Sequence, residues 1–334
     1  MLEIIKLDDE EKKSVILNTS EKYGLKPYII EKDLWVCYIL DYLFNRCIYK
    51  DYFIFKGGTS LSKGYGIIKR FSEDIDIILD WKFLGYSDEF LYKERNKTPQ
   101  NKINKEVIEK CSLFLSGEFI DRINKDLKKE LDKDFKILID ENDKDKCTVN
   151  FYYPSIFQNK YTREEIRLEI GPLAEKEPSH LVEIKPYIAT VYNKIFKHSK
   201  TLVKTVDAER TFWEKIAILH TIASGYKENN IPSRYARHYY DVYCLAKSDI
   251  KKNAFRHKDL FEKDILFKTK FYYAKKASYE TAYIGNVKLI PSNSSIELLK
   301  RDYEEMNEMF FSDYPSFDEI LNELKILEKE INNL

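Results

Sequence analysis

The first half of the chain alternates short apolar runs with longer amphipathic stretches, which is the pattern of a β-sheet with attached helices. Residues 8–23 and 27–45 have helical periodicity, and apolar side chains on most faces of the second stretch predict that it is buried. Aromatic and β-branched runs predict strands at residues 52–56, 74–80, 134–140, 147–153 and 165–170.

The segments between these strands are less uniform. The sequence TSLSKGYGIIKR, residues 59–70, predicts a helix that Thr59 or Ser60 caps. We expect residues 82–105, which are polar and include Pro99, to form a loop or insertion. Residues 106–131 have a helical pattern, and residues 181–206 are ambiguous, compatible with strand and loop.

Helical periodicity dominates the second half of the chain. It predicts helices at residues 207–223 and 234–247, followed by weaker ones to the end. A sheet-forming half followed by a helical half indicates an α+β fold, with a mixed β-sheet core, N-terminal helices and a C-terminal helical part. We expect a boundary near residue 205, which gives a core domain, 1–205, and a helical domain, 206–334.

Composition narrows the class of protein but does not identify a partner. Hydrophobic residues make up 43% of the 334, and 56 basic and 56 acidic residues leave no net charge. Only local charge can therefore indicate nucleic-acid binding. Five scattered cysteines without C-x-x-C spacing argue against a disulfide framework or a zinc site. No apolar run approaches ~20 residues and the N-terminus is acidic, so we expect a cytoplasmic protein without a membrane partner.

Two aspartates on one predicted strand are the first candidate for chemistry. Asp74 and Asp76 are two residues apart, so the period of a strand puts both carboxylates on one face, while Ile75 and Ile77 point to the other. Adjacent carboxylates repel each other unless a cation lies between them. Mg²⁺ prefers such oxygen ligands and keeps waters and substrate phosphates in its shell, so the pair is suited to holding a metal–triphosphate complex. A solvated strand edge is the alternative.

A glycine pair lies just upstream of these aspartates. Gly57 and Gly58 follow the predicted strand at 52–56, and glycine lets backbone N–H groups approach a phosphate closely. Ser60 and Lys63 add a hydroxyl and a cation at the start of the expected helix, where anions are favoured. A simple β-turn is the alternative, and the P-loop pattern is absent.

Together these motifs resemble the nucleotidyltransferase superfamily, and within it the AbiEii/AbiGii-type toxins of type IV toxin–antitoxin systems. The resemblance covers residues 28–80 and returns as two short motifs at 210–245. Its residues are Glu31-Lys32-Asp33, Phe55-Lys56-Gly57-Gly58-Thr59-Ser60-Leu61-Ser62-Lys63 and Phe71-Ser72-Glu73-Asp74-Ile75-Asp76-Ile77.

The resemblance implies transfer of a nucleoside monophosphate from an NTP to an acceptor hydroxyl, with Mg²⁺ or Mn²⁺ held by Asp74, Asp76 and a third carboxylate. Glu169 in EIRLEIG is the best match for that carboxylate, beside Glu165 or Arg167, although it could be an ordinary surface residue of a strand. The resemblance also implies the 3′ end of tRNA as acceptor and an antitoxin protein as partner. The nucleotide-binding residues that we expect are Gly57, Gly58, Thr59, Ser60, Lys63, Ser72 and Arg237.

Two residues of the helical half complete the expected catalytic set. Lys215 lies among apolar residues in WEKIAILH and matches a family lysine that touches the nucleotide; a lysine whose ammonium reaches solvent is the alternative. Asp241 matches the last family motif, where it would orient Lys215 or act as base, or it could simply pair with Arg237. The usual D-x-x-D-L form is not kept, because His238 stands at its first position.

The acceptor could also be recognised by a basic stretch. Residues 251–276 contain nine Lys and Arg against three acids, a net charge of +6, with interleaved aromatics that suit RNA. An amphipathic helical surface with its aromatics in the core is the alternative. Residues 297–330 have a net charge of −7, which would repel nucleic acid. Rival functions are a small-molecule nucleotidyltransferase of the antibiotic-modifying kind, a non-catalytic binding protein and a metal-dependent nuclease.

Overall fold

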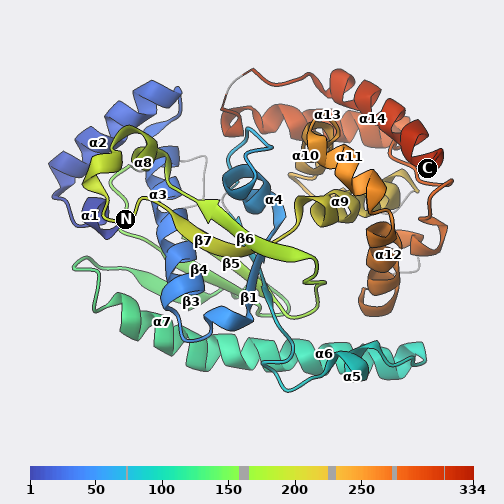
Figure 1. Cartoon of the computed structure of the whole chain (residues 1–334), viewed down its shortest axis with the longest axis horizontal. Coiled ribbons are helices and arrows are strands. Elements are labelled where there is room, and N and C mark those ends of the chain that lie inside the picture. Colours follow the sequence, from blue (N-terminus) through green and yellow to red (C-terminus); the bar gives the residue numbers. More distant parts are fainter. Residues whose placement is uncertain (73, 158–164, 225–230, 273–276, 312) are drawn as a thin grey trace. The chain divides into compact units, whose positions relative to one another are not determined.

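The computed structural model describes residues 1–72, 74–157, 165–224, 231–272, 277–311 and 313–334. The chain divides into two compact units, one formed by residues 1–65 and 71–206 and the other by residues 66–70 and 207–334. The first contains a seven-stranded mixed sheet with helices and the second is helical, which confirms the α+β fold class (Figure 1).

The sheet of the first unit has the strand order β3-β4-β5-β2-β1-β7-β6. Strand β1 is antiparallel to β2 and parallel to β7, and β2 is parallel to β5. The five predicted strands are confirmed, and the ambiguous stretch 181–206 contains most of β6 and all of β7. The strands are β1 (Phe53–Lys56), β2 (Asp74–Leu79), β3 (Lys136–Ile139), β4 (Thr148–Tyr152), β5 (Glu165–Gly171), β6 (Ser179–Ile184) and β7 (Thr201–Val206).

One face of this sheet is apolar and is covered by α3 (Pro27–Asp41), which packs on β5 and β7 (Figure 1). The ring of Trp35 in α3 lies 5.8 Å from that of Phe151 in β4. Residues Ile29–Leu40 of α3 are all buried, as the sequence predicts, so the helix forms the centre of the core. The opposite sheet face is the one on which the polar residues of β2 and β5 lie.

Two predictions about the segments around β2 were wrong. The helix expected over residues 59–70 ends early: α4 (Gly57–Thr59) continues as a π-helical turn, η3 (Ser60–Gly64), and Gly66 has a φ of +64°. Glycine at this left-handed position lets the chain leave the helix. The loop expected over 82–105 contains α5 (Asp88–Tyr92) and the start of α6 (Lys97–Phe114). Pro99 does not prevent α6, because it lies in the first turn, where its missing N–H is not needed.

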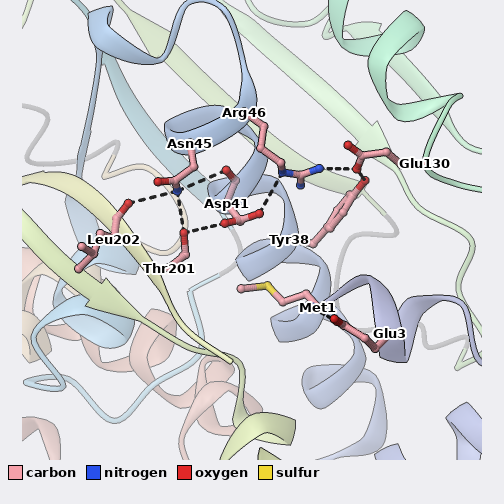
Figure 2. A network of polar contacts seen from close by, with 9 residues as sticks. All are labelled: Met1, Glu3, Tyr38, Asp41, Asn45, Arg46, Glu130, Thr201 and Leu202. Atoms are coloured by element: carbon pink, nitrogen blue, oxygen red, sulfur yellow. Dashed lines mark hydrogen bonds and ion pairs between the residues drawn. The ribbon is translucent and has the colours of Figure 1, made fainter. Parts of the chain in front are cut away.

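A polar network fixes the end of α3 against the sheet (Figure 2). Asp41 accepts hydrogen bonds from Arg46 Nε at 3.0 Å and from Thr201 Oγ1 in β7 at 2.8 Å. Arg46 also pairs with Glu130, which accepts from the Tyr38 hydroxyl. The remaining elements of this unit are α1 (Leu2–Ile5), α2 (Asp9–Tyr23), η1 (Tyr42–Arg46), η2 (Lys50–Tyr52), η4 (Leu115–Phe119), α7 (Ile120–Leu127), α8 (Tyr187–Val191) and η5 (Asn193–Ile195).

The second unit is built around α9 (Ala208–Ala223), on which α10, α11 and α12 pack. Trp213 at its centre donates from Nε1 to the carbonyl of Ala254 at 3.1 Å. The helices predicted at 207–223 and 234–247 are confirmed. The other elements are α10 (Ala236–Ala246), α11 (Asp249–Arg256), α12 (Asp259–Phe271), η7 (Tyr279–Thr281), α13 (Asn293–Glu305), η8 (Asn307–Met309) and α14 (Phe317–Asn332).

The basic stretch 251–276 forms most of α11 and α12, and its aromatic side chains belong mainly to the core of this unit. Phe261, Phe267 and Phe271 are buried, while Tyr272 is exposed. Tyr273, Lys275 and Lys276 lie outside the described residues. These positions favour the amphipathic-surface alternative over aromatic stacking on RNA bases. None of the described helices has the length and hydropathy that a bilayer crossing requires.

Candidate functional site

The two aspartates of β2 lie on the polar face of the sheet. Asp74 and Asp76 are half-buried, and they alternate with the fully buried Ile75 and Ile77. This alternation is what the pleat of a strand imposes, so the two carboxylates point to the same side. The prediction that they share a face is confirmed.

The neighbouring strand β5 adds a third carboxylate to this face. In the parallel register of β2 and β5, Asp74 is opposite Arg167 and Asp76 is opposite Glu169. Residues opposite each other in a ladder project to the same side. Ile166, Leu168 and Ile170 of β5 are buried on the other face. The structure therefore brings together Asp74, Asp76 and Glu169.

Arg167 lies among these carboxylates. Its Nε is 3.8 Å from Asp74 Oδ1 and 3.5 Å from Glu169 Oε1. Its Nη1 donates to Asp140, just beyond the end of β3. Burial alone would raise the pKa of Asp140, but bonds from the Asn142 backbone and Arg167 hold that pKa below its usual value. The acidic face thus contains its own cation.

Gly57 makes room for one of the aspartates. Its φ is +81°, and a Cβ at this position would lie 2.6 Å from Asp76 Cγ and closer still to Oδ2. No side chain fits at that distance, so the carboxylate of Asp76 occupies the space that a larger residue would fill. The glycine turn and the strand that carries the aspartates therefore lie next to each other, as predicted.

The hydroxyl residues of the loop bond to the loop itself. Thr59 Oγ1 donates to the carbonyl of Asp74 and, at 3.4 Å, to that of Ser72. Ser60 Oγ donates to the carbonyl of Gly57 at 2.8 Å. Both side chains are buried, while Ser72 is half-buried. Thr59 and Ser60 therefore fix the loop against the start of β2. Their contact with phosphate stays a prediction.

Lys63 is also engaged within its own unit. Its Nζ lies 2.6 Å from Asp33 Oδ1 and 3.8 Å from the centre of the Tyr187 ring. Asp33 accepts in addition from the backbone N–H of Tyr187 at 2.7 Å. Burial would lower the pKa of Lys63, but Asp33 raises it above its usual value, so the ammonium stays charged. This ion pair fixes the end of the loop to α3.

The Glu31-Lys32-Asp33 motif thus has a structural explanation. Asp33 holds Lys63, and Glu31 accepts from the backbone N–H groups of Ile156 at 2.8 Å and Phe157 at 3.1 Å. Both acids are buried in α3. They connect this helix to the glycine loop and to the segment that follows β4.

A second polar cluster lies in the helical unit around Asp241. Arg70 donates to both carboxylate oxygens, from Nε and Nη2, each at 2.8 Å. Lys215 Nζ lies 2.8 Å from Asp241 Oδ2, and all three side chains are buried. The structure therefore brings the expected Lys215 and Asp241 together, in a triad with Arg70.

The charges of this cluster shift each member's pKa. Burial alone would raise the pKa of Asp241, but Arg70 and Lys215 hold it well below its usual value. Burial lowers the pKa of Lys215 despite Asp241, and burial together with Lys215 and Arg237 holds the pKa of His238 well below its usual range. His238 is therefore neutral at pH 7, and Arg237 is close enough for its charge to matter. A carboxylate this acidic orients Lys215 better than it accepts a proton.

Sequence reasoning missed Arg70. Arg70 lies between Lys69 and Phe71, two residues after the apolar Ile68, and a charged residue must find a partner once it is buried. That signal could have drawn attention to Arg70 but not to Asp241, which is 171 residues away. Arg167 was noted only as a neighbour of Glu169.

The donor set of the acidic face fits a hard divalent cation. Among the residues that the structure describes, no three His, Cys, Asp or Glu side chains converge on one point. Mg²⁺ does not require such a cage, since it commonly uses one or two carboxylates together with waters and substrate phosphates. Asp74 and Asp76 on one face, with Glu169 on the next strand, supply oxygen ligands of that kind.

Comparison with known proteins identifies the family. The family model described as "Nucleotidyl transferase AbiEii toxin, Type IV TA system" matches residues 38–323. This chain belongs to the AbiEii family. The resemblance seen in the sequence motifs is confirmed, and the AbiEii-family protein is an enzyme of the nucleotidyltransferase class.

Two solved structures resemble the AbiEii-family chain. MenT4, a nucleotidyltransferase toxin from Mycobacterium tuberculosis H37Rv, is 15% identical over 93% of this chain and 98% of that chain, with a TM-score of 0.41. JHP933 from Helicobacter pylori is 13% identical over 91% of this chain and 99% of that chain, with a TM-score of 0.34. No curated protein sequence matches this one significantly.

Proposed function

We propose that this AbiEii-family enzyme is metal-dependent and transfers a nucleoside monophosphate from an NTP to the 3′-terminal hydroxyl of a tRNA. The observation that carries the proposal is the register of β2 and β5, because it sets Asp74, Asp76 and Glu169 side by side on one sheet face. The family assignment supports the class of reaction.

Each carboxylate has a role in this proposal. Asp74 and Asp76 would hold Mg²⁺ or Mn²⁺, and Glu169 would complete the set or accept the proton of the attacking hydroxyl. The bound metal would neutralise charge on the triphosphate and orient it. The acceptor oxygen forms a bond to the α-phosphorus, the bond from that phosphorus to the β-bridging oxygen breaks, and pyrophosphate leaves.

The glycine loop and the helical half would bind the rest of the nucleotide. Gly57 and Gly58 would present backbone N–H groups to the phosphates, and Thr59, Ser60, Ser72 and Lys63 would join them in binding the nucleotide. Lys215 and Arg237 would bind nucleotide phosphates as cations, with Asp241 orienting Lys215.

The family also suggests the cellular setting. A type IV toxin is counteracted by a separate antitoxin protein, which we propose as a partner. NTPs and tRNA are available together in the cytoplasm, where the five cysteines of this chain, all free, would stay reduced. Growth arrest on expression of the toxin without its antitoxin is the expected phenotype.

The test is transfer of label from each of the four labelled NTPs to tRNA in the presence of Mg²⁺, followed by sizing of the product. We expect one or more nucleotides to be added, chelation of the metal to abolish transfer, and added Mg²⁺ to restore it. Asp74→Asn with Asp76→Asn should abolish transfer. Glu169→Gln should lower it at least ~100-fold, whereas Glu165→Gln, on the same strand and face, should have little effect.

Other outcomes would support the rival functions. Shortened RNA would indicate a nuclease, and label on an aminoglycoside in place of RNA would indicate a small-molecule enzyme. No transfer from any NTP, combined with toxicity that survives the double aspartate substitution, would indicate a non-catalytic protein.

A further inference from the structure

Arg167 is a cation placed where the proposed function requires a metal. Its side chain is only 18% exposed, and its Nε faces Asp74 and Glu169 at 3.8 and 3.5 Å. Without a cation, half-buried carboxylates on adjacent strands would repel each other. The guanidinium removes that repulsion when no metal is bound, because an arginine is always protonated in proteins.

The contacts of Arg167 are unequal on its two sides. Nη1 donates to Asp140, which is 7% exposed and firmly held. Nε, by contrast, donates no hydrogen bond within the described part of the chain and lies beyond hydrogen-bond distance from both site carboxylates. The side facing Asp140 is therefore an anchor, and the side facing Asp74 and Glu169 is held by charge alone.

An acceptor is available on the side away from the aspartates. Asn150 in β4 lies directly opposite Arg167 in the ladder, on the far side of β5 from β2. Its side chain is buried, and within the described residues its Oδ1 accepts no hydrogen bond. A buried amide oxygen without a donor costs free energy, so a donor that turned toward it would be stabilised.

We propose that Arg167 is a positioning residue that acts as a resident counterion, which a divalent metal must displace from Asp74 and Glu169. On displacement the guanidinium keeps its contact with Asp140 and turns Nε toward Asn150 Oδ1. Arg167 thus keeps the carboxylates ordered without metal and sets the metal affinity of the face. This inference depends on the proposed function, because it takes Asp74 and Asp76 as the metal site.

The test measures Mn²⁺ affinity of the full chain by titration of free Mn²⁺, without substrate. Removing the competing charge in Arg167→Gln should tighten Mn²⁺ binding by about tenfold or more, since a like charge within ~4 Å disfavours the bound cation. Arg167→Lys keeps the charge and should stay within about twofold of the natural protein. Arg122→Gln, which loses a half-buried pair with Asp126, is the matched control and should leave Mn²⁺ affinity unchanged.

The direction of the effect separates this role from a merely structural one, because a damaged site binds metal less tightly. A folded Arg167→Gln protein with equal or weaker Mn²⁺ affinity would overturn the inference. If that variant does not fold, Asn150→Ala decides: it removes the alternative acceptor without changing any charge, and Mn²⁺ binding should weaken several-fold. Unchanged binding in Asn150→Ala would then overturn the inference. Failure of the proposed function gives a different result. In that case the double variant Asp74→Asn with Asp76→Asn would bind Mn²⁺ no more weakly than the natural protein.

Discussion

At the scale of single residues, the space beside Gly57 is the feature on which the acidic face depends. Gly57→Ala should lower the free energy of unfolding by about 1–2 kcal/mol because alanine is strained at a positive φ. The collision of the new Cβ with Asp76 should lower it further. Transfer activity should fall at least ~100-fold, because a displacement of about 1 Å at a reacting group has that effect. Unfolding in urea and label transfer from NTP measure the two losses.

Gly85→Ala is the matched control for the loss of stability that a positive φ alone causes. Gly85 has a φ of +85°, and a Cβ there would meet nothing within 4 Å. The Gly85→Ala variant should therefore lose the stability that the positive φ costs but keep its transfer activity. Equal activity in the two variants would mean that the position of Asp76 does not matter for transfer.

At the scale of elements, the ion triad of Arg70, Lys215 and Asp241 joins α9, α10 and the segment 66–70 within the helical unit. Asp241→Asn leaves two buried cations without a charged partner, and should cost about 3–5 kcal/mol of unfolding free energy at pH 7. The pKa of Asp241 is lower in the folded protein than in the unfolded chain, where it is about 3.9. The carboxylate therefore makes its full contribution to the free energy of unfolding above about pH 3.9. That contribution is lost as the pH falls through the pKa of the folded protein.

Unfolding in urea at pH 7, 5 and 3 measures this difference between the natural protein and the variant. The difference should be equal at pH 7 and 5 and smaller at pH 3. Asp318→Asn, in an exposed pair with Lys300, should change stability little at any pH. A natural protein no more stable than Asp241→Asn at pH 7 would contradict the importance of the triad.

The strands could be predicted from the sequence because their signal is local. Asp74–Leu79 alternates charged and apolar residues at its start, and glycine follows Lys56 directly. The start of α6 at Lys97 could not be found in this way, because a polar stretch with a proline resembles a loop unless the tertiary contacts are known. The same limit applies to side-chain partners. Lys63 pairs with Asp33 and Arg70 with Asp241, and nothing in the local sequence links either pair.

At the scale of the whole molecule, charge balance limits how tRNA can be recognised. The chain has 56 basic and 56 acidic residues. Part of the basic stretch 251–276 is already neutralised, since Lys251 pairs with Glu330 at 2.9 Å and Lys263 with Asp259 at 2.9 Å. Its buried phenylalanines cannot stack on bases. Long-range attraction of the tRNA backbone should therefore be weak, and the acceptor must be selected by short-range contacts.

The salt dependence of transfer tests this argument. Each phosphate contact contributes a slope of roughly −0.7 to −0.9 in a plot of log affinity against log salt. We expect a slope no steeper than about −2 for kcat/KM toward tRNA between 50 and 300 mM KCl at fixed Mg²⁺, equivalent to two or three phosphates. The KM for NTP, measured in the same series, corrects for effects of salt on the nucleotide site. A slope of about −5 or steeper would mean that a basic surface binds the RNA backbone, and residues 251–276 would then be the first candidate for that surface.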